Sequence, residues 1–185
     1  MLTLQSEIVF KICIFGDNGT GKTSFINRYL TGFFHTFYSK IEGVDFYSKR
    51  VEIDDHEVAL QIWDFSAEDR YRFLLPSFVN GCNAAIFMFD MTNYETIRHF
   101  EEWINIFRKG YSAKMEGTTL PIILVGGKSD LKYKRVISKE QAEKIVSSQN
   151  LYSYQECSAK TGENINLIFK EITELIKKRA GFLKF

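Results

Sequence analysis

The stretch that decides the fold is Gly16-Asp17-Asn18-Gly19-Thr20-Gly21-Lys22-Thr23, which matches the pattern G-x-x-x-x-G-K-[ST] in full. It follows the run of β-branched and aromatic residues Ile8–Phe15, which predicts a buried strand, and it opens a helical pattern over Lys22–Tyr29. Glycines at these spacings let successive backbone N–H groups turn inward, and the helix N-terminus adds the positive end of its dipole. The stretch therefore predicts a loop that cradles phosphate oxygens.

Two side chains of this loop have specific chemistry in such a site. Lys22 would reach the β and γ phosphates of a nucleotide, and the Thr23 hydroxyl would bind Mg²⁺. The alternative is a glycine-rich turn that carries an ordinary surface lysine. A phosphate loop alone indicates a nucleoside triphosphatase or a nucleotide kinase, so the base must be identified from other residues.

Strand patterns alternate with helix patterns on both sides of this loop. Strands are expected over Ile8–Phe15, Val44–Ile53, Glu57–Phe65, Ala84–Asp90, Pro121–Gly126 and Tyr152–Cys157. Helices are expected over Lys22–Tyr29, over Glu95–Lys109, from Ser138 with Gln141 as capping-box partner, and over a final amphipathic segment from Ile165 to Ile176. The order predicts an α/β fold with a mostly parallel sheet, one antiparallel edge hairpin and helices on both faces. Ligands of such sheets bind beyond the carboxyl ends of the strands.

Composition limits the classes of protein to consider. The chain has 185 residues, of which 45% are hydrophobic, and its 24 basic residues nearly balance its 23 acidic ones. We expect one globular domain over residues 1–185 and no nucleic-acid binding. Three widely spaced cysteines and the lack of a signal-peptide pattern predict buried reduced thiols and a cytoplasmic location. The apolar runs are too short for a membrane helix and the C-terminal segment KKRAGFLKF has no cysteine for prenylation, so membrane contact is expected to be peripheral at most.

Two later segments predict how a base is recognised. Gly127-Lys128-Ser129-Asp130 follows one buried strand, and Ser158-Ala159-Lys160 follows the last. The Asp130 carboxylate can accept from both N–H donors on the Watson–Crick edge of guanine, whereas adenine presents the opposite pattern. The stem of Lys128 could cover one face of the base, and the N–H of Ala159 could donate to its carbonyl oxygen. Alone, Lys-Ser-Asp is a common surface tripeptide.

Together with Gly43-Val44-Asp45-Phe46, Leu60–Asp64 and Glu156–Lys160, these motifs stand in the order typical of one family. From about Ile8 to about Lys178, the chain resembles the Ras-superfamily small GTPases and is closest to the Rab branch. The resemblance implies a P-loop NTPase G domain, with its core at about residues 8–178, that binds GTP or GDP with Mg²⁺.

The resemblance also implies roles for individual residues. Lys22 and Glu68 fall on catalytic positions, and Thr23 and Asp64 fall on positions that hold Mg²⁺. An aromatic side chain that packs on the base falls on Phe34. The residues expected to bind the nucleotide are Asp17, Asn18, Gly19, Thr20, Gly21, Lys22, Thr23, Ser24, Phe34, Tyr38, Lys128, Asp130, Ser158, Ala159 and Lys160.

The chain departs from the family pattern at chemically important positions. Ile41 stands where a threonine binds Mg²⁺ and senses the γ-phosphate, although it could simply pack while backbone groups hold the switch. Ala67 replaces a hinge glycine, and Glu68 replaces the glutamine that orients the attacking water. An ionised carboxylate only accepts hydrogen bonds and repels phosphate. Gly127 replaces the base-site asparagine, and Asn18 stands where many relatives carry a small residue. These changes predict somewhat weakened guanine binding and slow or partner-dependent hydrolysis.

Two surface features could meet partners. Phe46, Trp63 and Phe78 match the aromatic triad that Rab-like proteins present to effectors, and the alternative is that they are ordinary residues at the edge of the core. The switch regions would meet effector and regulatory proteins as well. The basic run Lys177–Arg179 could touch anionic lipid, but favourable charge at a helix C-terminus explains it better.

Three functional hypotheses follow from these motifs. The first is a Rab-like GTPase switch, in which γ-phosphate contacts order the segments Tyr38–Phe46 and Ala67–Arg72. The second is a pseudo-GTPase, a binding module or scaffold that holds guanine nucleotide without efficient turnover. The third, a P-loop nucleotide kinase, leaves the two base motifs unexplained and lacks an Arg-rich lid segment.

Overall fold

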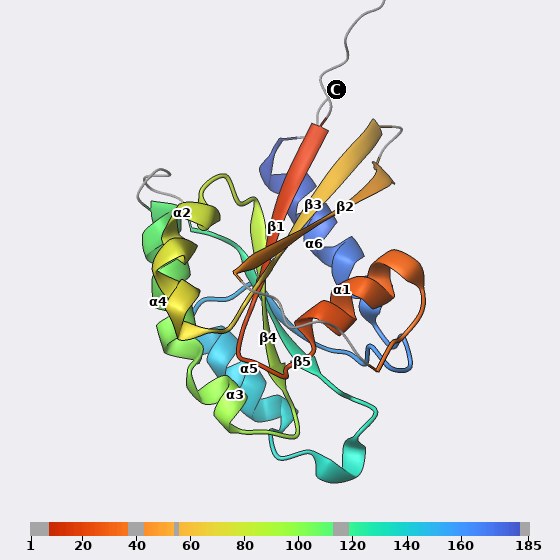
Figure 1. The fold of residues 1–185 in the computed structure, drawn as a ribbon, viewed down its shortest axis with the longest axis vertical. Coiled ribbons are helices and arrows are strands. Elements are labelled where there is room, and N and C mark those ends of the chain that lie inside the picture. The colour runs from red at the N-terminus through yellow and green to blue at the C-terminus, as the bar shows by residue number, and fades with distance from the viewer. Residues whose placement is uncertain (1–7, 37–42, 54–55, 113–118, 182–185) are drawn as a thin grey trace, which may run out of the picture.

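A six-stranded sheet lies at the centre of the computed structural model, which describes residues 8–36, 43–53, 56–112 and 119–181 (Figure 1). The strands run in the spatial order β2-β3-β1-β4-β5-β6. Their bounds are β1 Ile8–Phe15, β2 Val44–Ile53, β3 His56–Phe65, β4 Ala84–Asp90, β5 Ile122–Gly127 and β6 Ser153–Glu156. Every neighbouring pair is parallel except β2 with β3. The predicted fold class, including the antiparallel edge hairpin, is confirmed.

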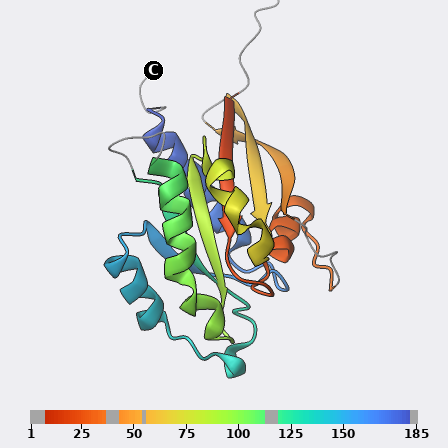
Figure 2. The same cartoon turned by 60° about the vertical axis from the view of Figure 1, so that its left-hand side comes forward.

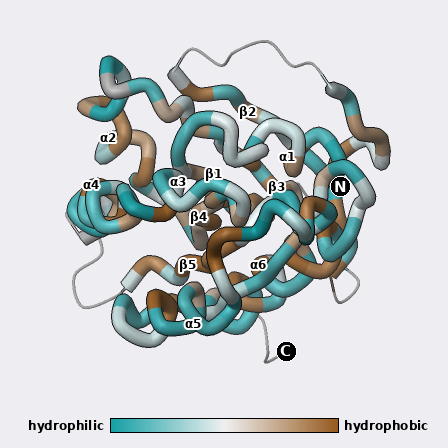
Figure 3. Tube along the Cα trace, turned by 90° about the horizontal axis from the view of Figure 1, so that it is seen from below, coloured by the Kyte–Doolittle hydropathy of each residue, from teal (hydrophilic) through white to brown (hydrophobic). Residues whose placement is uncertain are grey.

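Burial explains which strands lie in the middle. All seven residues of β4 and all six of β5 are buried, as expected for continuous apolar runs covered on both faces. The edge strand β2 instead has mostly exposed or half-buried residues. Figure 3 shows brown, hydrophobic segments around β4 and β5, whereas the outer turns of α4 and α5 are largely teal.

Helices cover both faces of the sheet (Figures 1 and 2). On one face, α1 (Lys22–Thr31) and α6 (Ile165–Arg179) meet through the stacked rings of Tyr29 and Phe169, whose centroids are 3.7 Å apart. Of the described helices, the other face carries α2 (Leu75–Val79), α3 (Glu95–Arg98), α4 (Phe100–Ser112) and α5 (Lys139–Ser148). There the rings of Phe15 and Phe107 stack at 3.7 Å. Two short 3₁₀ helices, η1 (Asp69–Leu74) and η2 (Lys132–Lys134), complete the fold.

Local sequence signals account for several helix boundaries. The predicted capping box at the start of α5 is confirmed, because Gln141 N donates to the Ser138 hydroxyl and Ser138 N donates to the Gln141 side chain. The sequence predicts no helix over η1 and α2, but Pro76 in the first turn of α2 is compatible with helix initiation there. Among the described residues, no helix is long and apolar enough to cross a bilayer.

The predicted helix Glu95–Lys109 is two helices in the structure. The backbone leaves the helical region at His99, with φ −82° and ψ 8°, and α4 then continues to Ser112. The Thr96 hydroxyl accepts from Asp90 N at 2.9 Å, which fixes α3 to the end of β4. The amphipathic period alone does not reveal this break, because it depends on contacts with distant parts of the chain.

Gly110 lies inside α4, where glycine is an unfavourable helix residue. A Cβ at this position would lie 2.8 Å from both the Cα and the carbonyl oxygen of Pro76. The missing side chain therefore allows α2 and α4 to approach closely.

We expect Gly110→Ala to lower the free energy of unfolding by about 1–2 kcal/mol in urea titrations. Overpacking against backbone costs roughly 1–3 kcal/mol, whereas the gain in helix propensity is at most about 1 kcal/mol. Lys109→Ala, an exposed change in the same helix, serves as the control and should shift stability by less than about 0.5 kcal/mol. A Gly110→Ala protein that is more stable than wild type would contradict this account.

Candidate nucleotide-binding site

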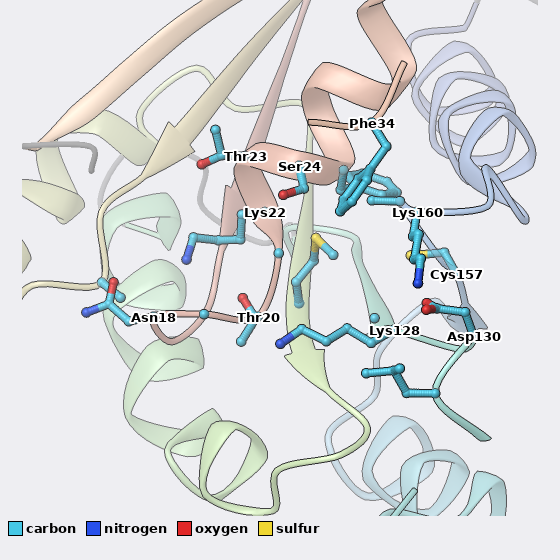
Figure 4. A pocket seen from close by; sticks show the side chains of 18 of the residues that line it. Asn18, Thr20, Lys22, Thr23, Ser24, Phe34, Lys128, Asp130, Cys157 and Lys160 are labelled. Atoms are coloured by element: carbon cyan, nitrogen blue, oxygen red, sulfur yellow. The ribbon is translucent and has the colours of Figure 1, made fainter. Parts of the chain in front are cut away.

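The three predicted motifs line one cavity of about 650 Å³ at the carboxyl ends of the parallel strands. Figure 4 shows Asn18, Lys22 and Thr23 toward one end, Phe34, Asp130 and Lys160 toward the other, and Lys128 running between them. The predicted residues that line it are Asn18, Gly19, Thr20, Gly21, Lys22, Thr23, Ser24, Phe34, Lys128, Asp130, Ala159 and Lys160. Segments that are far apart in sequence thus meet in a single site.

The phosphate loop adopts a conformation that needs glycine. Gly16 has φ +135°, and a Cβ there would lie 2.1 Å from the carbonyl oxygen of Met88. Gly21 caps α1 with φ +98°. Both positions disfavour any residue with a side chain, so the pattern of glycines has a direct backbone cause.

The Lys22 ammonium lies inside this loop. It donates to the carbonyl oxygens of Gly16 at 2.9 Å and Asp17 at 3.0 Å, and the residue is buried. Burial lowers the pKa of Lys22, while the nearby carboxylates of Asp64 and Asp17 act in the opposite direction. A buried ammonium within a glycine-rich loop at a helix N-terminus is well placed to bind an anion.

Thr23 and Asp64 form the other polar contact of the loop. The Thr23 hydroxyl donates to Oδ2 of Asp64 at 2.7 Å, and the parallel register of β1 and β3 brings Asp64 beside Ile14. Oδ1 of Asp64 is buried without a hydrogen-bond partner among the described residues. Burial raises the pKa of Asp64 to about 6, although Lys22 and Thr23 oppose that rise. An orphaned buried carboxylate oxygen beside a hydroxyl fits the hard oxygen ligands that Mg²⁺ prefers.

At the opposite end, Asp130 is held by Ser158. The Ser158 hydroxyl donates to Oδ1 of Asp130 at 2.6 Å and itself accepts from Thr161 N at 3.1 Å. Lys128 donates to Oδ2 of Asp90 at 2.5 Å, which stretches its aliphatic stem along the cavity. The carboxylate and the apolar stem are thus positioned before any base arrives.

Gly127 has a packing role that its sequence position does not suggest. A Cβ there would lie 2.9 Å from the backbone carbonyl oxygen of Thr20. The phosphate loop therefore packs directly on the end of β5, and an asparagine at this position would require the loop to move.

Four predicted site residues are not among the described residues that line the cavity: Asp64, which accepts from the Thr23 hydroxyl, and the three that follow. Asp17 turns its side chain away toward α4, Ser158 lies behind Asp130, and Glu68 pairs with Arg70 at 2.5 Å with its side chain only 14% exposed. Tyr38, predicted to bind the nucleotide, and Ile41, a departure from the family pattern, both lie outside the described residues.

Other described residues line the cavity although they were not assigned from the sequence to nucleotide, metal or catalysis. They are Phe25, Thr36, Phe65, Ser66, Ala67, Met88, Gly127, Leu131 and Cys157. Among them, Ala67 and Gly127 were identified only as departures from the family pattern. Ser66 and Ala67 lie in the segment that departs from the family pattern, and Cys157 lies in Glu156–Lys160, so the motifs point to their region. Met88 belongs to β4, whose sequence indicates only a buried strand. Its proximity to the phosphate loop is a tertiary contact that the local sequence does not indicate.

The predicted aromatic triad is contiguous in the structure. The ring centroids of Phe46 and Trp63 are 4.5 Å apart, and those of Trp63 and Phe78 are 5.8 Å apart. Phe46 is 59% exposed, whereas Trp63 and Phe78 are half-buried. The Lys11 ammonium lies 3.3 Å from the Trp63 ring centroid, on the stretch of β1 before the phosphate loop. The triad is therefore partly core edge and partly exposed surface.

We expect Asp64→Asn to stabilise the metal-free, nucleotide-free protein at pH 7.5. A pKa raised from 3.8 to about 6 means that ionised Asp64 costs stability, roughly 3 kcal/mol at about 1.4 kcal/mol per unit, above pH 6. This cost disappears as the pH falls through 6 toward 3.8, so the difference between variant and wild type should shrink at pH 5. Urea unfolding in EDTA at the two pH values measures it.

Asp90→Asn is the contrasting control for that experiment. Asp90 is also buried, but it accepts hydrogen bonds from Lys128 and from the backbone and side chain of Thr92. Its removal should therefore destabilise the protein. A metal-free Asp64→Asn protein that is less stable than wild type at pH 7.5 would show that Asp64 has partners that satisfy it.

The model of the Ras family matches residues 11–178, which include the phosphate loop, both switch segments and both base motifs. The match begins within β1 and ends within α6, so it covers all or part of every described strand and helix. Members of this family are guanine nucleotide-binding switch proteins with GTPase activity. With the cavity that joins Lys22 to Asp130, the match shows that this chain belongs to the Ras family of small GTPases.

Proposed function

We propose that this protein is a Rab-like switch that binds GTP and GDP with Mg²⁺ and hydrolyses GTP slowly or only with a partner. The observation that carries the proposal is the single cavity that joins the phosphate loop to Asp130. A fixed distance between a phosphate cradle and a guanine-selective carboxylate selects a guanine nucleotide rather than a free phosphate or a free base.

The residues at each end support separate parts of this proposal. Lys22 supplies positive charge from the loop to the β and γ phosphates. Asp130 accepts from the guanine N–H donors while Ser158 restrains it. Because Asp130 is already oriented, less side-chain entropy is lost on binding.

Thr23 and Asp64 would hold the Mg²⁺ ion, which when bound supplies positive charge beside the phosphate oxygens. Thr23 and Asp64 are now hydrogen-bonded to each other, and the Thr23 hydroxyl and the Asp64 carboxylate would turn to the ion. Displacement of that hydrogen bond is compensated, because the buried oxygen Oδ1 of Asp64 gains a partner.

The structure of the segment after Asp64 supports slow hydrolysis. Ala67 lines the cavity and is buried, so the position that the family gives to a flexible glycine is packed. Glu68 is held in an ion pair with Arg70 and lies outside the cavity lining. A carboxylate in that position lacks the N–H group with which an amide orients the attacking water.

The Rab-like part of the proposal rests on the exposed edge of the aromatic triad. Phe46 presents an exposed ring edge-on to Trp63, at an interplanar angle of 86°, beside the switch segments. Rigid aromatic side chains of this kind are typical binding hot spots. We propose that effector and regulatory proteins bind there, and that the chain acts as one cytoplasmic domain.

Calorimetry with GDP and ADP at constant Mg²⁺ tests the binding proposal. Two hydrogen bonds from guanine to a charged acceptor contribute roughly 1.5–3 kcal/mol each, so GDP should bind about 10²–10⁴-fold more tightly than ADP. Asp130→Ala should remove most of this preference, and Ser129→Ala, a neighbouring control, should keep it. Equal affinities of the wild-type protein for GDP and ADP would refute the proposal.

A pseudo-GTPase that holds guanine nucleotide without efficient turnover is the second candidate, and Glu68 is the observation that favours it. We expect Glu68→Gln to raise the single-turnover rate of phosphate release at least about 10-fold, because a positioned group contributes about 10²-fold or more. Arg70→Ala is the matched control, since it breaks the ion pair but keeps the carboxylate and should give little gain.

The outcome of that assay also separates the two candidates. A wild-type rate equal to that of ordinary family members would reject slow hydrolysis. A slow wild-type rate that Glu68→Gln does not raise would assign the defect to Ile41 or Ala67 instead.

A further inference from the structure

The carboxylate of Asp17 is held from outside the phosphate loop. The indole N–H of Trp103 donates to Oδ1 at 2.8 Å, and Nδ1 of His99 lies 2.7 Å from Oδ2. Trp103 is fully buried, and the Asp17 side chain is only 16% exposed. Both oxygens of this loop residue are therefore used by one helical segment, α3–α4.

The backbone of the same residue holds the inside of the loop. The carbonyl oxygen of Asp17 accepts from the Lys22 ammonium at 3.0 Å and from the Thr20 hydroxyl at 2.9 Å. The next residue, Asn18, lines the nucleotide cavity. A movement of the Asp17 side chain would consequently move groups that face the phosphates.

This arrangement lies at the interruption between α3 and α4. His99 stands at the break, and Trp103 follows four residues later, with its backbone N–H bonded to the His99 carbonyl at 3.2 Å. Residues four apart share one face of a helix. Two donors on that face can therefore meet the two oxygens of one carboxylate.

We propose that His99 and Trp103 are positioning residues for nucleotide binding, which hold Asp17, and through it the phosphate loop and Lys22, in the conformation that retains the phosphates. The inference rests on the proposed function, because Lys22 acts on phosphates only if the cavity binds a nucleotide. The two donors differ in one respect: the indole keeps its N–H at every pH, whereas the imidazole can also carry a charge.

The charge on His99 sets the strength of the contact. The hydrogen bond with Asp17 raises the pKa of His99 above 6.5, and partial burial opposes this. The other charged groups that face His99 are Glu102 of α4, which favours the proton, and Arg72 of η1, which disfavours it. The ring is 41% exposed, so it exchanges protons with water.

The sign of the pH effect follows from that direction. Below about pH 6.5 the imidazolium makes a charge-assisted hydrogen bond to Asp17 and adds positive charge near the loop. As the pH rises through the raised pKa, both contributions are lost, and the loop is held by Trp103 and a weaker neutral contact. Dissociation of the nucleotide should then become faster.

The test is the dissociation rate of a fluorescent N-methylanthraniloyl GDP, chased with excess GDP at constant Mg²⁺ from pH 6.5 to 8.5. The wild-type dissociation rate should rise about 3- to 10-fold over this range, because a charge-assisted hydrogen bond is replaced by a weaker neutral one. Asp64, whose pKa is raised to about 6, is mostly ionised over this range, and any slope from its remaining protonation would persist in a His99→Ala protein.

Three variants separate positioning from general damage. His99→Ala removes the donor, so it should dissociate faster than wild type at pH 6.5 and lose the pH slope. His99→Asn keeps an N–H near the position of Nδ1 but cannot gain charge. Its dissociation rate should therefore be the same at every pH and close to the rate of the wild-type protein at pH 8.5. His56→Asn, at the distant start of β3, is the control and should retain the wild-type profile.

Trp103→Phe gives a second, independent readout. It removes the N–H but keeps an aromatic ring, and it should speed dissociation while retaining the pH slope, because His99 is still present. Thermal unfolding of each variant shows whether it is folded, and His99→Ala remains decisive where the buried Trp103 change lowers stability.

The possible failures can be told apart. A flat wild-type profile, a slope that survives in His99→Asn, or a His99→Ala protein with wild-type rates would overturn the positioning role while leaving nucleotide binding intact. Failure of the wild-type protein to bind the fluorescent GDP would instead refute the proposed function on which the inference rests.

Discussion

The pair of buried opposite charges, Lys22 and Asp64, is the constraint on which the site depends. Taking either charge out of water is costly, and neither is fully compensated by the other, since burial lowers the pKa of Lys22 and raises that of Asp64. A stable fold tolerates this only if the surrounding elements hold both groups firmly. The parallel pairing of Ile14 with Asp64 and the left-handed glycines of the loop supply that constraint. A polyanion and a divalent cation are the ligands that would relieve both penalties at once.

The sequence predicts this site well because its signals are local. A strand, a glycine pattern and a helix start are contiguous, and the hydrogen bonds of the capping box at Ser138 span only three residues. The break at His99 was not predicted, because it accompanies a contact with Asp17, 82 residues earlier in the chain. From the sequence alone, Gly110 is only an unfavourable helix residue. The structure shows the reason for it, because Pro76 packs closely against it. What escapes prediction in each case is close approach between segments that are distant in sequence.

The base end shows how a departure from the family pattern can be absorbed by the backbone. An asparagine at position 127 would place its Cβ 2.9 Å from the Thr20 carbonyl oxygen, too close for the present position of the loop. With Gly127, the phosphate loop rests directly on β5, and Ser158 holds Asp130 in place. The loss of one side chain therefore does not leave the base site without support. The expectation of weakened guanine binding applies to the contact with the base itself rather than to the shape of the site.

The departures in the second switch segment fall on a different part of the nucleotide from the retained residues Lys22 and Asp130. Lys22, which would reach the β-phosphate of either nucleotide as well as the γ-phosphate of GTP, lies in one preformed cavity with Asp130, which would bind the base. Ala67 and Glu68 differ where the family senses the γ-phosphate. A ligand shifts a conformational equilibrium only by its difference in affinity for the two states, however tightly it binds. Strong binding and weak switching are therefore compatible in one protein. The contact of Asp17 with α4 acts on the shared part of the nucleotide, so it would set how long either form stays bound without setting which form is preferred.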